Sequence, residues 1–377
     1  MSIRVHSWLN PPILDLICVA VLCVILTLGL WPFHAPANHV TWLANCNGLS
    51  FGHPGTVIAR TAFPLTSPDR QPSAAIEVWL QPERIWDSAT FLAFYTPGKP
   101  HQLSLRQSLA DFELQSGASH LYLANAFRKP KPVFLTIVSG PSGTQVYANG
   151  VLARTDPQLM LSAREFSGRL VLGDSPAQPD NWSGMLLGLA IYHCELTPDR
   201  VQRHYQTWTR NGQPEISLED RNVTLYLFNE QAGNVIHDRA GSGPDLDIPL
   251  KYQVLDKIFL EPFWTEFSFS RSYWSSVVKN IVGFLPFGFC FYPCLVLHKL
   301  RRPALAAVLL GTLVSLTIEI LQAYLPTRDS GTTDIFTNTL GTWLGVVAFR
   351  AVNGILTRRY QTNLIPISDT VVAIRQH

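Results

Sequence analysis

Hydrophobic residues in this chain gather in four long runs, interrupted by one long stretch of mixed polarity. The runs cover residues 13–33, 277–297, 304–324 and 335–356. Each is close to the roughly 20 residues with which a helix crosses about 30 Å of hydrocarbon. In lipid an open segment satisfies its backbone hydrogen bonds only as a helix. The pattern therefore predicts four transmembrane helices, with a large domain inserted between the first and the second.

Between residues 38 and 250 the pattern changes to short alternating runs broken by Pro, Gly, Asn and Asp. Strands are predicted at 75–80, 133–138, 145–147 and 187–192. The dipeptide Asn149-Gly150 separates two such runs, which is a strong signal for a two-residue hairpin. One short helical run begins at Thr197-Pro198-Asp199. Many short strands and a single minor helix predict an all-β sandwich.

Basic residues beside the spans predict the orientation of the chain. They lie before the first span, between the second and third spans and after the fourth, as Arg4, Lys299, Arg301, Arg302, Arg358 and Arg359. The turn between the third and fourth spans holds only Arg328. Because cytoplasmic loops carry an excess of Lys and Arg, we expect both termini in the cytoplasm of a bacterial inner membrane and residues 38–276 outside it.

The first span allows a second interpretation. Ala35-Pro36-Ala37 resembles a small-residue cleavage site, so residues 1–37 could be a removed signal peptide. The apolar run is long for a signal core, which favours a retained helix. Both interpretations place the insert outside the cytoplasm.

The composition of the chain excludes several classes of function. The chain is 47% hydrophobic and 15% charged, with a net charge of +2. A nucleic-acid partner would require a strongly basic surface, which this balance does not supply. The sequence also lacks a Gly-rich phosphate loop, a metal-type spacing of His and Cys, and a nucleophile motif. We therefore expect no cofactor and no resident metal.

Six motifs of the insert, in chain order, carry a resemblance to a known fold. They occupy residues 76–79, 146–150, 168–173, 182–184, 189–192 and 196–198. This succession resembles the concanavalin-A-like jelly roll of laminin-G (LamG) type, which implies binding of glycans or proteins, in some members with calcium. The segment 225–233 resembles the strand that usually opens such domains, but here it comes last. A sandwich whose two ends are adjacent tolerates this permutation.

The resemblance implies several candidate residues. Asp174, Asp180 and Asp238 are candidate calcium ligands, although turn-forming aspartates are the favoured interpretation. Some relatives of the fold are glycosidases, which need two carboxylates about 5 Å apart. No second carboxylate follows Glu77 until Glu83, beyond Pro82, which argues against that activity.

The cysteines fall into two groups. The resemblance implies that Cys46 and Cys194 lie on strands that this fold often pairs, so a disulfide is expected, with two free thiols as the alternative. The four others lie in the predicted spans, where small apolar filling is the simplest interpretation: Cys18, Cys23, Cys290 and Cys294.

Residues 251–276 form an aromatic segment directly before the second span. It contains Phe259, Phe263, Trp264, Phe267, Phe269, Tyr273 and Trp274. Aromatic residues collect at membrane interfaces, so the segment is predicted to be an interfacial linker, with a ligand groove as the alternative.

Polar residues cluster at one end of the predicted spans: Asn280, Glu319, Gln322, Arg328, Asp329, Asp334 and Asn338. Helical rise places Glu319 about 7 Å from the end of its helix, at the depth where Asp334 and Asn338 enter. A carboxylate inside a span costs several kcal/mol unless it is paired or hydrated, so Glu319 marks a candidate functional site. The alternative is a structural network that pairs Glu319 with Arg328 and Asp334 with Asn338. Gly341 and Gly345 form a small-xxx-small pair, which allows close approach of another helix.

This constellation resembles the VanZ-like membrane family. The matching positions are Asn280, Phe284, Pro286, Gly288, Glu319, Gln322, Arg328, Asp334, Asn338 and Gly341. The resemblance covers the first span and residues 277–356, and the family takes its name from a protein linked to teicoplanin resistance. The large insert departs from the minimal form of the family.

Five segments are predicted: 1–37 with the first helix, the sandwich 38–250, the linker 251–276, the helical unit 277–357 and a cytoplasmic tail 358–377. The leading hypothesis is a non-enzymatic envelope protein, anchored in the bilayer, whose sandwich binds a glycan, a glycopeptide or an extracytoplasmic protein. The alternative is a membrane enzyme or carrier for lipid-linked cell-wall or polysaccharide precursors. In it, Glu319 acts as a base and Arg328 binds a phosphate or carboxylate, with Asp334 as a further candidate.

Overall fold

The computed structural model describes residues 10–64, 73–162, 164–177, 179–214, 223–267 and 271–363. The chain divides into two compact units. One is the inserted domain, Ala35–Lys257, and the other combines Met1–His34 with Ile258–His377. Each unit is described by itself below.

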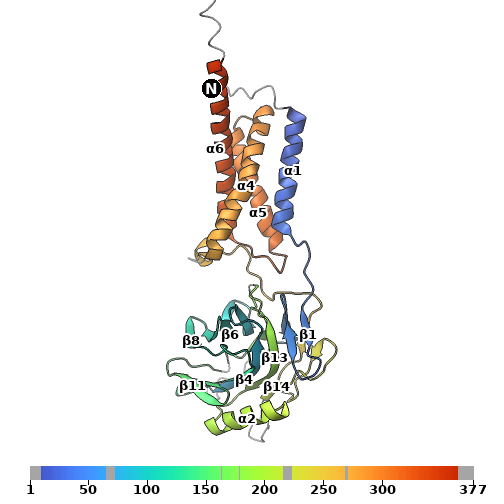
Figure 1. Cartoon of the computed structure of the whole chain (residues 1–377), viewed down its shortest axis with the longest axis vertical. Coiled ribbons are helices and arrows are strands. Elements are labelled where there is room, and N and C mark those ends of the chain that lie inside the picture. The colour runs from blue at the N-terminus through green and yellow to red at the C-terminus, as the bar shows by residue number, and fades with distance from the viewer. Residues whose placement is uncertain are drawn as a thin grey trace, which may run out of the picture. The chain divides into compact units, whose positions relative to one another are not determined.

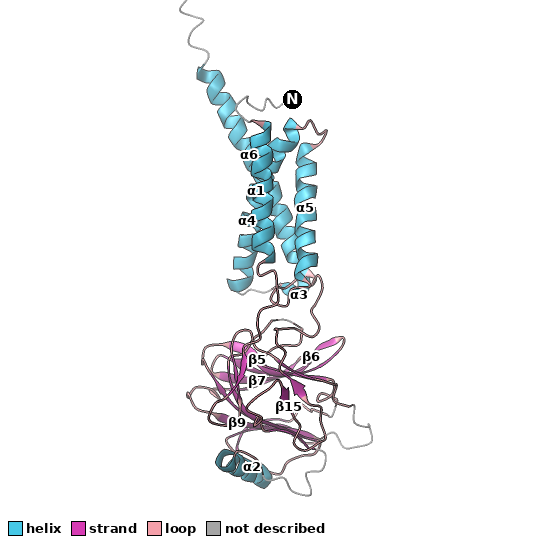
Figure 2. Ribbon diagram, turned by 90° about the vertical axis from the view of Figure 1, so that its right-hand side faces the viewer, coloured by secondary structure: helices cyan, strands magenta, loops and turns pink. Residues whose placement is uncertain are grey.

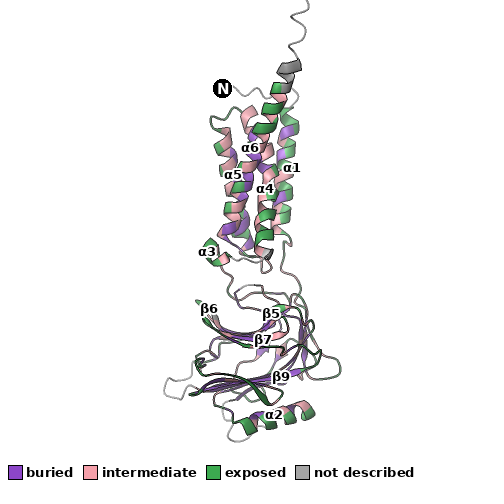
Figure 3. Ribbon diagram, turned by 60° about the vertical axis from the view of Figure 1, so that its left-hand side comes forward, coloured by how far each residue is buried: buried purple, intermediate pink, exposed green. Residues whose placement is uncertain are grey.

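The second unit is a helix bundle (Figures 1 and 2). Its helices are α1 (Pro11–Leu30), the short α3 (Phe263–Glu266), α4 (Arg271–Leu297), α5 (Pro303–Gln322) and α6 (Thr332–Asn363). Four of them are long and apolar enough to cross a membrane, which confirms the predicted number of spans. Many residues of these helices are exposed (Figure 3). Large apolar residues are among them, including Leu16, Leu28, Leu309 and Leu313. Such side chains are suited to lipid, and the chain is an integral membrane protein.

Different polar side chains lie at the two ends of the helix bundle. At the end where the chain leaves for the insert, Gln322 of α5 bonds to Gly29 of α1, and Asn280 of α4 bonds to Asp334 of α6. We call this the insert end. At the opposite end, where both termini leave the bundle, Asp15 of α1 contacts Cys294 of α4. We call this the terminal end.

The inserted domain is a sandwich of two eight-stranded antiparallel sheets, as predicted. The first sheet contains, in order, β1 (Val40–Trp42), β2 (Leu49–Phe51), β13 (Gly184–Tyr192), β4 (Ala74–Pro82), β9 (Val133–Gly140), β10 (Gly143–Ala148) and β11 (Val151–Asp156), with β14 (Val223–Tyr226) also beside β13. The second contains β15 (Val235–Ile236), β16 (Leu246–Asp247), β3 (Val57–Ala59), β12 (Arg169–Leu172), β5 (Ser88–Thr96), β6 (Lys99–Ser108), β7 (Asp111–Ser116) and β8 (Ser119–Leu123).

The main core lies between the two sheets and is built from alternating inward residues, with Phe91 and Trp182 among the largest. A second core covers the other face of the first sheet, where α2 (Pro198–Asn211) packs through Val201 and Trp208 (Figure 1). Central strands of this sheet are therefore buried on both faces, and every residue of β9 is buried.

Two local predictions can be checked directly. Asn149 and Gly150 both have positive φ and join β10 to β11, so the predicted hairpin is confirmed. The two ends of the domain lie side by side, because Ala37 bridges to Lys251 and the Tyr252 amide donates to the Pro36 carbonyl. This pairing closes the domain beyond residue 250, so the first residues assigned to the linker pack with the sandwich instead.

The expected disulfide is wrong. Cys46 and Cys194 are free thiols. Cys46 lies in the turn between β1 and β2, three residues before Leu49, which is opposite Leu186 of β13. Cys194 lies two residues beyond Tyr192, the last residue of β13, and Tyr192 is six positions, or roughly 20 Å, beyond Leu186. A disulfide needs Cα atoms about 6 Å apart.

Candidate functional site

The polar residues predicted in the spans form one layer at the insert end of the bundle. Glu319 of α5 is its centre and is 1% exposed. One carboxylate oxygen accepts the Gly331 amide at 2.8 Å, and the Ser330 hydroxyl donates to the Glu319 backbone carbonyl at 2.9 Å. The turn between α5 and α6 is thereby folded over the end of α5.

Two further side-chain bonds connect the helices within this layer. The Asn280 amide of α4 donates to the Asp334 carboxylate of α6 at 2.6 Å. The Asn338 amide of α6 donates to the Ser315 hydroxyl of α5 at 2.9 Å, and both residues are buried. Each bond fixes the rotation of one helix against another.

The first helix joins the layer through its backbone. The Gln322 amide donates to the Gly29 carbonyl at 2.8 Å, and the Arg328 guanidinium donates to the Trp31 carbonyl at 2.9 Å. Carbonyls of the last helical turn lack partners within the helix, and a cation there also opposes the negative end of the helix dipole. Arg328 is therefore a cap for α1.

The pairs that the alternative structural network proposed are not the ones observed, although their residues do gather in one layer. Arg328 binds carbonyls of α1 rather than the carboxylate of Glu319. Asp334 is bonded to Asn280 rather than to Asn338. Asp329 lies exposed in the turn between α5 and α6.

The sequence did not indicate two acidic residues of the linker that contact this layer, Glu266 through its carboxylate and Glu261 through its backbone. Glu266 of α3 accepts the Thr333 amide at 2.9 Å and the Thr333 hydroxyl, at the start of α6. Glu261 pairs through its backbone with Gly331. Both belong to the aromatic linker, whose pattern of rings predicts only a membrane interface. Acidic residues placed directly before a span could have indicated helix capping.

A second candidate site lies within the sandwich. A pocket of about 540 Å³ opens between the β5–β6 turn, the start of β12 and the end of the domain. Its lining includes Phe63, Tyr95, Pro97, Arg169 and Asp256. This volume lies in the range of small-ligand sites, and the lining combines aromatic surface with a few charged groups.

The local backbone explains how the pocket forms. Gly168 has a φ of +83° and lies so close to Tyr95 that an added Cβ would overlap its carbonyl oxygen. The Tyr95 hydroxyl donates to the Asp256 carboxylate, which ties the end of the domain to β5. Burial, together with this bond, raises the pKa of Tyr95 to about 12, so the hydroxyl is a stable donor.

Glu77 is not a surface carboxylate of a glycosidase. It is fully buried beneath α2, where it accepts the Tyr192 hydroxyl at 2.8 Å and lies 3.2 Å from Nδ1 of His204. A substrate cannot reach it there. The cluster joins α2 to the first sheet.

The three candidate calcium ligands are occupied by hydrogen-bond donors. Asp174 accepts the amides of Ser175 and Asp180 and the Tyr252 hydroxyl. Asp180 accepts a guanidinium bond from Arg106 at 2.6 Å. Asp238 accepts the amides of three residues, Leu225, Ala240 and Gly243. These carboxylates organise loops, which agrees with the turn-forming interpretation.

Comparison with known proteins supports the membrane assignment. Residues 222–353 match the family model VanZ/LLP1; the match includes α4, α5 and most of α6 and confirms the resemblance found in the last three spans. No curated protein matches the chain.

Solved structures that resemble the chain do so at low identity. A SAP-like pentraxin from Limulus polyphemus is 18% identical, with a TM-score of 0.30, over 40% of this chain and 81% of that one. A candidate carbohydrate-binding protein from Bacteroides ovatus is 14% identical, with a TM-score of 0.39, over 54% and 59%. The receptor binding domain of botulinum neurotoxin D is 12% identical, with a TM-score of 0.35, over 54% and 61%. The alignments therefore span less than two thirds of the last two proteins.

Proposed function

We propose that this membrane protein is a binding protein of the bacterial cell envelope, whose sandwich holds a glycan or glycopeptide outside the cytoplasmic membrane. The observation that carries the proposal is the pocket between Tyr95, Arg169 and Asp256. Ligand pockets in proteins combine apolar walls with a few polar groups that fix orientation. Sugars present apolar C–H faces and hydroxyl groups, which match this combination.

The polar groups of the pocket are held in place before a ligand arrives. Arg169 donates to the Arg60 carbonyl at 2.9 Å, and Asp256 accepts the Tyr95 hydroxyl. Side chains that are already ordered lose little entropy on binding. Predicted topology adds support, because it exposes the sandwich to the envelope while both termini stay in the cytoplasm.

The helix bundle serves in this proposal as an anchor, and the polar layer as its lock. An enzyme or carrier that acts through Glu319 and Arg328 would need both groups to face one substrate. The bonds of Arg328 to Trp31 and of Glu319 to Gly331 favour the structural role instead.

The test is ligand binding by the full chain in lipid nanodiscs. The panel contains muropeptides, envelope polysaccharide fragments and teicoplanin, each with and without calcium. We expect one glycan or glycopeptide to bind, and Arg169→Ala and Asp256→Asn to weaken it at least about ten-fold, as for loss of a buried polar contact.

The matched control is Arg154→Ala, which removes the same charge from the exposed edge strand β11 of the other sheet. Binding that is equally weakened by Arg154→Ala would reduce the effect to surface charge and contradict the proposed pocket. A panel without any binder would overturn the proposal. Binding of a panel ligand that tolerates both pocket substitutions would place recognition elsewhere and contradict the proposed pocket.

A further inference from the structure

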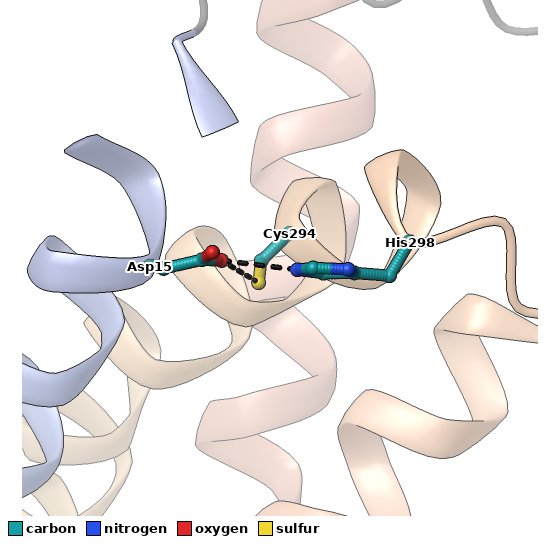
Figure 4. Close-up of side chains that lie close together, drawn as sticks. All are labelled: Asp15, Cys294 and His298. Carbon is teal, nitrogen blue, oxygen red and sulfur yellow. Dashed lines mark hydrogen bonds and ion pairs between the residues drawn. The ribbon is translucent and has the colours of Figure 1, made fainter. Parts of the chain in front are cut away.

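Three metal-ligating side chains converge at the terminal end of the bundle. The Asp15 carboxylate of α1 lies 3.1 Å from Sγ of Cys294 and 3.1 Å from Nε2 of His298, both on α4 or directly after it (Figure 4). All three ligand atoms lie within 4.8 Å of one another. Nothing in the polar layer or the sandwich pocket uses these residues.

Helix geometry explains the convergence. Cys294 and His298 are four residues apart, and the His298 amide donates to the Cys294 carbonyl at 3.0 Å, so the two side chains lie on one face of the helical turn that ends α4. Asp15 faces them from α1, whose neighbouring residue Leu14 packs in the same small cluster as Cys294. The sequence shows no metal-type spacing here, because these side chains come from two segments nearly 280 positions apart.

A fourth candidate ligand lies beside these three. Cys18 is three residues after Asp15, is 4% exposed and packs in the same cluster as Cys294, although its thiol lies outside the 4.8 Å group of the other ligand atoms. The set then contains two thiols, one imidazole and one carboxylate. Thiolate and imidazole favour zinc over the hard cations magnesium and calcium, which prefer oxygen ligands.

The observed distances suit a tetrahedral ion. Zinc bonds of about 2.0 Å to oxygen and nitrogen and about 2.3 Å to sulfur place neighbouring ligand atoms roughly 3.3–3.6 Å apart. The separations between Asp15 and its two partners differ from this by only a few tenths of an ångström. Small side-chain adjustments are therefore enough to admit the ion.

We propose that Asp15, Cys18, Cys294 and His298 form a zinc(II) site that joins α1 to α4 at the terminal end. Two thiolates and one carboxylate exceed the charge of the ion by one, and Lys299, Arg301 and Arg302 follow in the adjacent turn. Asp15 and His298 are partly exposed, with 46% and 55% of their side chains accessible, which leaves a route for the ion. The alternative is a simple ion pair between Asp15 and His298. An exposed pair of this kind adds little to the stability of the fold, and it does not involve the two thiols.

The experiment uses the full chain, purified in detergent with an affinity tag that contains no histidine. After equilibration with zinc chloride and removal of free ion, metal and protein sulfur are measured by elemental mass spectrometry. We expect about one zinc ion per chain, as in a structural four-ligand site. His298→Ala and Cys294→Ser should lower the affinity at least about ten-fold.

Cys23→Ser is the matched control, because Cys23 lies on α1 but is exposed. It should retain the zinc content of the native chain. Substitution with cobalt gives a second readout, since thiolate ligands produce an intense near-ultraviolet charge-transfer band that Cys18→Ser should weaken by about half if two thiolates bind.

A native chain with no more zinc than His298→Ala would overturn the proposal. So would a cobalt complex without the thiolate band. The exposed position of His298 keeps the test decisive even if Cys294→Ser disturbs helix packing.

Discussion

Gly345 of α6 lies directly against the backbone of α4 at Leu285. An added Cβ at Gly345 would overlap the Leu285 carbonyl oxygen and lie 2.7 Å from the Phe289 amide nitrogen. Gly288 and Gly341 make equally close approaches, to Thr342 and Ile281. Between membrane helices, such contacts replace the hydrophobic driving force that lipid removes. The small-xxx-small pair seen in the sequence is therefore a helix interface.

Gly345→Ala should destabilise the bundle by about 1–3 kcal/mol, because the added methyl group must separate two backbones. Gly354→Ala is the matched control on the same helix, since an added Cβ there meets nothing within 4 Å. Without a clash, alanine improves helix propensity by up to about 1 kcal/mol. Thermal unfolding of the two variants in detergent measures the difference, and equal midpoints would contradict the close contact.

Glu319 provides the second prediction. Glu319→Ala removes the acceptor of the Gly331 amide and should cost about 1–3 kcal/mol, the penalty for a buried donor left unpaired. Glu319→Gln keeps an acceptor oxygen and should stay close to the native stability. Chemical unfolding of the full chain in mixed micelles measures both variants.

The same pair of variants also tests the enzymatic alternative. A function that is lost in Glu319→Gln, in a chain that still assembles normally, would show that the carboxylate itself is required. Thr317→Ala, on an exposed position of the same helix, controls for the handling of the protein.

The four spans were predictable because burial in lipid acts on single segments, so hydrophobicity and length suffice. The membership of the polar layer was predictable for a similar reason, since the rise per residue fixes depth. The hydrogen bonds within the layer were not predictable. Whether Asp334 contacts Asn280 or Asn338 depends on the rotation of each helix about its axis, and the partner of Arg328 depends on where α1 ends.

In the sandwich, alternation predicted strands but not their long-range neighbours. The pocket depends on three segments that are distant in the sequence and on the close approach of Gly168 to Tyr95. Cys46 and Cys194 were expected to be close because their strands are, but Cys46 lies in the β1–β2 turn near the Leu186 register and Cys194 lies beyond the end of β13. Residue type and spacing carry no information on that register.

Asp174 predicts a specific dependence of sandwich stability on pH. Burial raises the pKa of its carboxyl from 3.8 to about 7, although three hydrogen bonds oppose the shift. The folded domain thus holds a proton that the unfolded chain releases. The contribution of Asp174 to the free energy of unfolding is therefore greatest below about pH 4. It decreases as the pH rises to about 7, by up to about 1.4 kcal/mol per pH unit.

Asp174→Asn imitates the protonated acid and should remove this part of the slope. Unfolding of the excised domain, residues 35–257, between pH 4.5 and 8 gives the comparison. Glu83→Gln, an exposed carboxylate changed to an amide, should keep the native slope. Parallel pH profiles for the native domain and Asp174→Asn would show that Asp174 is already ionised throughout this range.

The cluster of Glu77, Tyr192 and His204 predicts that α2 is attached to the sheet by polar as well as apolar contacts. Burial, with Glu77 nearby, holds the pKa of Tyr192 well above its ordinary value, so its hydroxyl remains a donor to the carboxylate. His204→Ala removes the other side-chain partner of a fully buried carboxylate and should cost about 3–5 kcal/mol. Arg203→Ala, one position earlier and exposed, should change stability by less than about 0.5 kcal/mol. Urea unfolding of the excised domain measures both, and similar small effects would mean that α2 is held by Val201 and Trp208 alone.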